Sequence, residues 1–180
     1  MNKQLKDKAR YLFDVYSLKT WESIPTGSYF LDLMVCPDLD VYIPLERVKD
    51  IFLVSEAVYK NLHTEEIYVM KGKIPDLAGS HHIQVRTNIV SGIAKWKIDI
   101  WILTEKIIEK KQRQLQEYRN KLDNKSREEI LAIKRALINK SGFTPKYSSF
   151  HVYEAYFDHG IRTIQKIKEF LAAQNIVLDG

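Results

Sequence analysis

Cysteine is nearly absent from this chain, because Cys36 is the only one among its 180 residues. One thiol can form neither an intrachain disulfide nor a four-cysteine zinc site, so a disulfide-rich secreted scaffold is excluded. We therefore expect the reducing cytoplasm as the compartment. The sequence also lacks any run of about 18 apolar residues, the length that a membrane-spanning helix needs. We accordingly expect no association with a membrane.

The composition is that of a globular protein, with 45% hydrophobic residues and only seven glycines and five prolines. Neither a collagen-like nor a disordered chain fits these values. The net charge of +5 is unevenly divided: residues 1–103 carry 13 basic and 13 acidic residues, whereas residues 104–180 carry 15 and 10. A basic second part could face a polyanion, although a solvated set of helices is the more common explanation.

Hydrophobic periodicity predicts a mixture of strands and helices up to residue 103. Alternating side chains or short apolar runs predict strands at 38–43, 67–70, 82–90 and 94–103. Apolar residues at helical spacing predict helices over 2–19 and 45–62.

Helical patterns alone follow Thr104. A charged helix is expected up to Leu122, and Ser126 with Glu129 predicts a capping box that opens the next one. We therefore predict an α+β fold, in which a small mixed sheet with flanking helices occupies residues 1–103 together with an N-terminal helix. A helical C-terminal region is expected over residues 104–180.

Three aspartates stand where acids are costly unless something pairs with them. Asp38 and Asp40 are two residues apart on an expected strand, so both side chains leave the same face. Asp99 lies inside the apolar strand 94–103, where burial of a charge needs a partner. If the two strands are neighbours, the three carboxylates converge and can hold two Mg²⁺ ions about 3.5–4 Å apart. Taken alone, Asp38 is more simply a cap of the turn after Pro37, and Asp40 a solvent-facing strand residue.

Gly27 and Ser28 precede this strand by a gap of nine residues. A glycine allows the backbone to approach a phosphate closely, and backbone N–H groups and a hydroxyl at a helix start can bind the anion. The pair therefore predicts a phosphate-binding turn.

This arrangement resembles the signature of the nucleotidyltransferase superfamily, the polymerase-beta-like enzymes that include the aminoglycoside and lincosamide nucleotidyltransferases. The matching parts are Gly27-Ser28, then Asp38-Leu39-Asp40-Val41, then Asp99 on a later strand, and they fall within residues 20–103. The resemblance implies the nucleotidyltransferase fold and the transfer of a nucleoside monophosphate, AMP above all, from a nucleoside triphosphate. It implies that Asp38 and Asp40 bind two Mg²⁺ ions, that Asp99 completes the catalytic metal site, and that Gly27 and Ser28 contact the triphosphate.

The resemblance also implies that a helical domain lends a Lys or Tyr to the triphosphate. By residue type, Lys134, Lys146 and Tyr147 are the candidates. Residues on strands beside the expected site, such as Arg86, Lys95 and Lys97, could touch phosphates, although solvated strand faces are the commoner outcome. His81 and His82 are adjacent on a strand and point to opposite faces, so we do not expect them to share a metal.

The sequence does not identify the acceptor of the nucleotidyl group, which could be a small molecule, RNA or a protein. It does not give the oligomeric state either, and an oligomer is possible. Two other functions compete with the enzyme. One is a non-catalytic nucleotidyltransferase-like binding partner, of the toxin–antitoxin kind. The other is a nucleic-acid-binding protein whose acids are incidental, which would show a steep salt dependence of binding.

Overall fold

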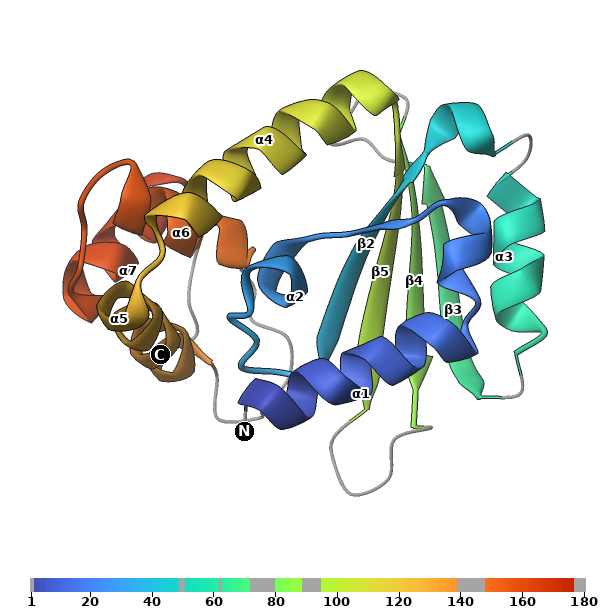
Figure 1. Ribbon diagram of the computed structural model, residues 1–180, viewed down its shortest axis with the longest axis horizontal. Coiled ribbons are helices and arrows are strands. Elements are labelled where there is room, and N and C mark those ends of the chain that lie inside the picture. Colours follow the sequence, from blue (N-terminus) through green and yellow to red (C-terminus); the bar gives the residue numbers. More distant parts are fainter. Residues whose placement is uncertain are drawn as a thin grey trace.

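Figure 1 shows the computed structural model, which describes residues 2–48, 51–61, 63–71, 80–88, 95–138 and 148–176. Within these residues, five strands form one mixed sheet in the order β1-β2-β5-β4-β3. The strands are β1 (Ile24–Pro25), β2 (Asp38–Pro44), β3 (Thr64–Lys71), β4 (His81–Thr87) and β5 (Trp96–Leu103). The helices are α1 (Asn2–Val15), α2 (Gly27–Leu31), α3 (Ile51–Tyr59), α4 (Glu105–Lys121), α5 (Asn124–Leu137), α6 (Ser149–Phe157) and α7 (Ile164–Ala173), with short 3₁₀ helices at Leu18–Trp21 and Leu45–Arg47.

The expected α+β class is confirmed, and the four expected strands are found as β2, β3, β4 and β5. β2 and β5 are parallel neighbours, whereas the other strand pairs are antiparallel. Because β2 and β5 lie side by side, the condition for the three aspartates to converge is met.

The sheet has one face in the main hydrophobic core. Alternate residues of β2, beginning with Leu39 and Val41, are fully buried and pack with α1 and α3, as do Ile98 and Ile100 of β5. Figure 1 shows α1 lying across this face of the sheet and α3 beside β3. Burial of each such side chain stabilises the fold by about 1.5–3 kcal/mol. The opposite face is therefore the one that carries the polar residues of β2 and β5.

The helices after β5 surround a second core, and α4 runs from the end of β5 to the group formed by α5, α6 and α7 (Figure 1). Two residues from the first part of the chain, Leu31 and Leu33, are buried in this second core, whereas the next residue, Met34, belongs to the first. The segment around α2 therefore packs into both cores. None of the described helices is long and apolar enough to cross a membrane.

Two local predictions are wrong. The helix expected over residues 45–62 is instead a 3₁₀ helix at Leu45–Arg47, followed by α3 from Ile51, and Val48 between them is extended. The helix expected to open at a Ser126–Glu129 capping box begins earlier, because Asp123 is its N-cap. The Asp123 carboxylate accepts from the backbone N–H of Ser126 at 2.7 Å, and the Ser126 hydroxyl accepts from the N–H of Asp123 at 2.9 Å. Ser126, three residues after the N-cap, therefore has the role in the capping box that was expected of Glu129.

Candidate active site

The register between the parallel strands β2 and β5 brings the three aspartates together. Asp40 lies directly opposite Asp99, and Asp38 lies opposite Lys97. One carboxylate oxygen from each of Asp38, Asp40 and Asp99 lies within 4.8 Å of the others. Side chains two residues apart on a strand share a face, so all four residues point away from the main core. The sequence-based expectation that these carboxylates converge is confirmed.

Lys97 is part of this cluster, contrary to the expectation of a solvated strand face. Its ammonium lies 2.6 Å from Asp99 Oδ2 and 3.2 Å from Asp38 Oδ2, and the residue is only 8% exposed. Burial disfavours the charged lysine, but the charges of Asp38 and Asp99 outweigh burial and raise its pKa above the usual range. Lys97 is therefore a fixed positive charge between the acids.

The second oxygen of Asp99 is held by β4. His82 Nε2 and Gln84 Nε2 both donate to Asp99 Oδ1, each at 3.0 Å. The His82 ring stacks on Trp101, with centroids 3.8 Å apart and planes 3° from parallel. Burial raises the pKa of Asp99, but the hydrogen bond from His82 and the charge of Lys97 outweigh burial and lower it to about 2. Asp99 is thus oriented and kept ionised by its neighbours.

The sequence does not indicate Gln84, and it indicates His82 only as one of two adjacent histidines, without a role beside Asp99. The signal available was the alternation of β4, which puts His82 and Gln84 on one face and His81 on the other, as expected for adjacent strand residues. Nothing in the sequence showed that this face of β4 would lie against Asp99.

Asp38 and Asp40 are less well compensated than Asp99. Burial raises the pKa of Asp38 to about 6, although the charge of Lys97 opposes the shift. Burial and the charges of Asp38 and Asp99 raise the pKa of Asp40 well above its ordinary value of 3.8. Asp38 Oδ1 is buried without a hydrogen-bond partner among the described residues. Three converging carboxylates with an unpartnered oxygen are a donor set that fits a hard divalent cation such as Mg²⁺.

Gly27 lies against Asp40. Its φ of +58° is in the left-handed region, which glycine adopts without cost, and a Cβ added there would meet Asp40 Oδ2 at 2.9 Å. The backbone N–H of Thr26, the residue before it, donates to the carbonyl of Asp40 at 3.1 Å. The positive φ and the close approach of Asp40 both favour glycine at this position, and the second of them places the Gly27-Ser28 turn next to the carboxylates.

Ser28 connects this turn to the C-terminal helices. Lys134 of α5 donates from Nζ to Ser28 Oγ at 2.8 Å, to the Leu33 carbonyl at 2.6 Å and to the Tyr153 hydroxyl at 2.9 Å. Ser28 Oγ and Tyr153 OH are themselves 3.0 Å apart. Of the three helical candidates, the structure thus brings Lys134 to Ser28, whereas Lys146 and Tyr147 lie outside the described residues. Tyr153 of α6 is a further polar group here that the sequence did not indicate.

Replacement of Lys134 by methionine is expected to destabilise the protein by about 1–3 kcal/mol, because the Leu33 carbonyl and the Ser28 hydroxyl lose a charged donor. Urea denaturation of the variant beside the unmodified chain measures the loss. The matched control is Arg135→Met, a loss of charge at the next, exposed residue of α5, which should change stability by less than about 0.5 kcal/mol. Equal stability of the two variants would contradict this role of Lys134.

Comparison with known proteins gave no match: no family model, no curated protein and no solved structure matches the chain. The site must therefore be interpreted from its own geometry and chemistry.

Proposed function

We propose that this protein is a metal-dependent nucleotidyltransferase, which moves a nucleoside monophosphate, AMP by preference, from a nucleoside triphosphate to an acceptor. The observation that supports it best is the convergence of Asp38, Asp40 and Asp99 within 4.8 Å. Gly27 lies directly against one of these acids, so a phosphate-binding turn and a cation-binding cluster adjoin. Such a combination suits phosphoryl transfer, which depends on positioning and on neutralisation of charge.

Each residue of the site has a role in this proposal. Asp38 and Asp40 would hold two Mg²⁺ ions, and Asp99, which β4 keeps oriented and ionised, would complete the metal site beside the acceptor oxygen. Bound ions would neutralise the triphosphate and make the acceptor hydroxyl more acidic. Gly27 and Ser28 contact the phosphates in this proposal, because Gly27 lies against the Asp40 carboxylate and the Ser28 hydroxyl lies beside the Lys134 ammonium.

The acceptor is proposed only as a hydroxyl or phosphate group on a small molecule, an RNA or a protein. The excess of basic residues after residue 103, 15 against 10 acidic ones, favours an anionic acceptor over a cationic one.

Binding of a nucleoside triphosphate is expected to require a divalent cation. The carboxylates of Asp38 and Asp40 would otherwise repel the phosphates, and Lys97 compensates only part of their charge. Calorimetry with ATP should show affinity in Mg²⁺ that falls at least about tenfold in EDTA. Equal affinity in both conditions would contradict the proposal.

Transfer itself is tested by incubation with nucleoside triphosphates labelled at the α-phosphate, in Mg²⁺, with pools of RNA, protein and small-molecule acceptors. Label should move to one pool. The control for contaminating activity is the Asp40→Asn variant, purified in the same way and assayed beside the unmodified protein. ATP bound with Mg²⁺ but transferred to no pool would favour the second candidate below.

The contacts of Lys97 favour a non-catalytic alternative, a nucleotidyltransferase-like binding partner of the toxin–antitoxin kind. Its ammonium already neutralises Asp38 and Asp99, as a bound cation would. A binding partner of this kind would form a stable complex with the other member of the pair without Mg²⁺, and no nucleotidyl group would be transferred. A nucleic-acid-binding protein, the third candidate, would bind RNA or DNA with a steep dependence on salt and without any dependence on Mg²⁺.

A further inference from the structure

Lys97 contacts the acids of the site in the way that a metal ion would. Its ammonium lies between two carboxylate oxygens, 2.6 Å from Asp99 Oδ2 and 3.2 Å from Asp38 Oδ2. The backbone N–H of Lys97 donates to the Pro37 carbonyl at 3.0 Å, so the base of the side chain is fixed beside β2. Only 8% of the residue is exposed, so little of it reaches water. A positive charge therefore already occupies part of the cluster.

The oxygens that remain free belong to Asp38 and Asp40. Both oxygens of Asp99 have partners, because side chains of β4 donate to Oδ1 and Lys97 contacts Oδ2. Asp38 Oδ1 is buried without a hydrogen-bond partner, and the Asp40 carboxylate makes no hydrogen bond or ion pair with the described residues. Mg²⁺ is commonly held by one or two carboxylates, with phosphate oxygens and water as its other ligands. The free oxygens thus suit one ion.

The charges of the site lead to the same number. With the three carboxylates ionised, the single ammonium leaves two negative charges uncompensated, which one divalent ion balances. An ion bound to Asp99 Oδ2 would lie beside the Lys97 ammonium, and two cations repel each other strongly in a largely buried place. A second ion can therefore reach Asp99 only after Lys97 has moved.

We propose that Lys97 holds the position of the second metal ion, so that the chain without nucleotide binds one divalent ion, through Asp38 and Asp40. The phosphates of a triphosphate would attract the ammonium, which is a point charge on a flexible stem, away from the acids. Asp99 Oδ2 would then be open to the second ion. This inference rests on the proposed function, since it takes the carboxylates to bind metal and triphosphate. It makes Lys97 the residue that sets the order in which they bind.

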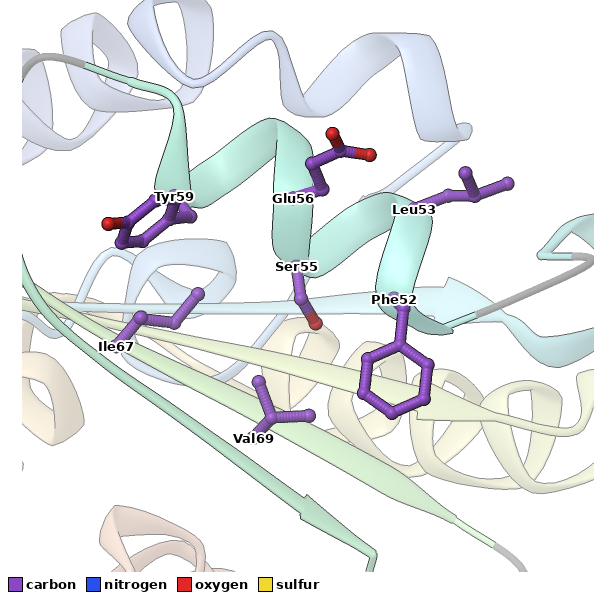
Figure 2. Close-up of a pocket in the computed structure, with 7 residues that line it drawn as sticks. All are labelled: Phe52, Leu53, Ser55, Glu56, Tyr59, Ile67 and Val69. Carbon is purple, nitrogen blue, oxygen red and sulfur yellow. The ribbon is translucent and has the colours of Figure 1, made fainter.

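Ions that bind tightly to this chain can be assigned to the cluster. Asp38, Asp40 and Asp99 are the one group of three potential ligands within the part of the chain that the structure describes. The groove between α3 and β3, which Figure 2 shows, offers an ion only one charged ligand, the carboxylate of Glu56. Lys60 already pairs with this carboxylate at 2.5 Å. The number of tightly bound ions therefore measures the occupancy of the cluster.

Titration of the full chain with Mn²⁺ in the absence of nucleotide tests the inference, because Mn²⁺ replaces Mg²⁺ and electron paramagnetic resonance counts the bound ions. The unmodified chain should bind about one ion tightly. Lys97→Met should bind about two, because the ammonium no longer occupies the oxygens. Lys97→Arg keeps the charge and should bind about one. Circular dichroism in Mn²⁺ shows whether each variant is folded, and the count for the unmodified chain needs no variant.

Asp40→Asn should bind the ion at least about tenfold more weakly, since it lacks one of the two ligands. The control is Lys95→Met, which removes a lysine that pairs with Glu65 and Glu66 and should leave the count at one.

One ion on the unmodified chain and two on Lys97→Met support the inference. No ion or two ions on the unmodified chain, one ion on folded Lys97→Met, two on Lys97→Arg or on the control, or an unchanged affinity in Asp40→Asn would each overturn it. A chain that binds ions as expected but transfers no nucleotide would contradict the proposed transfer and leave the role of Lys97 intact. The two failures are therefore distinguishable.

Discussion

Replacement of Asp40 by asparagine should abolish nucleotidyl transfer and at the same time make the metal-free protein more stable. Asparagine keeps the shape of the side chain but removes a charge that the proposed Mg²⁺ site needs, so turnover should fall by about a hundredfold or more. The opposite effect on stability arises because the charge of Asp40 is only partly compensated, and burial and the charges of Asp38 and Asp99 raise its pKa well above 3.8. Radiolabel transfer and thermal denaturation in EDTA measure the two effects.

The gain in stability should depend on pH in a defined direction. A folded-state pKa above the unfolded value means that folded Asp40 binds more protons than unfolded Asp40, so its contribution to stability falls as pH rises from about 3.8 through its raised pKa. Asparagine does not titrate, so the difference in Tm between variant and unmodified protein should grow over that range. Near-normal turnover would remove Asp40 from the metal site, and a lower Tm would show that its charge is compensated.

Replacement of Lys97 by methionine is expected to have the largest effect on stability, a loss of about 3–5 kcal/mol without metal. Methionine has a similar length but no charge, and it leaves Asp38 and Asp99 without the cation that lies 3.2 and 2.6 Å from them. Because Asp40 is close by, three carboxylates would then repel one another in a largely buried place. Urea denaturation in EDTA measures the loss.

Mg²⁺ should restore part of this stability, because an ion that binds only the folded chain stabilises it by mass action. The variant should also bind Mg²⁺ more tightly than the unmodified chain, in which Lys97 competes for the same oxygens. The control is Lys95→Met, which removes a lysine of 42% side-chain exposure and should cost far less stability than Lys97→Met, because solvent screens its ion pairs. If Lys97→Met and Lys95→Met lose the same stability, or if Mg²⁺ restores none of it, Lys97 is not the counter-ion of the acids.

The acids of the site could be predicted from sequence because the information that places them is local. A spacing of two on a strand fixes the common face of Asp38 and Asp40, and an acid inside an apolar strand, as at Asp99, calls for a partner. The same rule puts Lys97 on the face of Asp99, two residues away. Local rules do not say whether a lysine on that face meets solvent or acids, since this depends on which strand lies next to β5.

The rest of the site arises from long-range packing. Lys134 and Tyr153 reach Ser28 from positions more than 100 residues along the chain, and no periodicity predicts that α5 and α6 pack against α2. The helix expected over residues 45–62 shows that a local pattern can also predict too much. Its apolar residues do recur at helical spacing, but Val48 adopts an extended conformation before α3 begins. Tertiary packing therefore overrides the local pattern at that place.

The segment around α2 has a mechanical consequence. At one end Gly27 is in contact with Asp40, and a few residues later Leu31 and Leu33 are buried among the C-terminal helices, to which Lys134 also ties the Leu33 carbonyl. Such a short, doubly packed link transmits force, because close-packed interiors have low compressibility. A displacement of α5 or α6 is therefore expected to shift Gly27 relative to the Asp40 carboxylate.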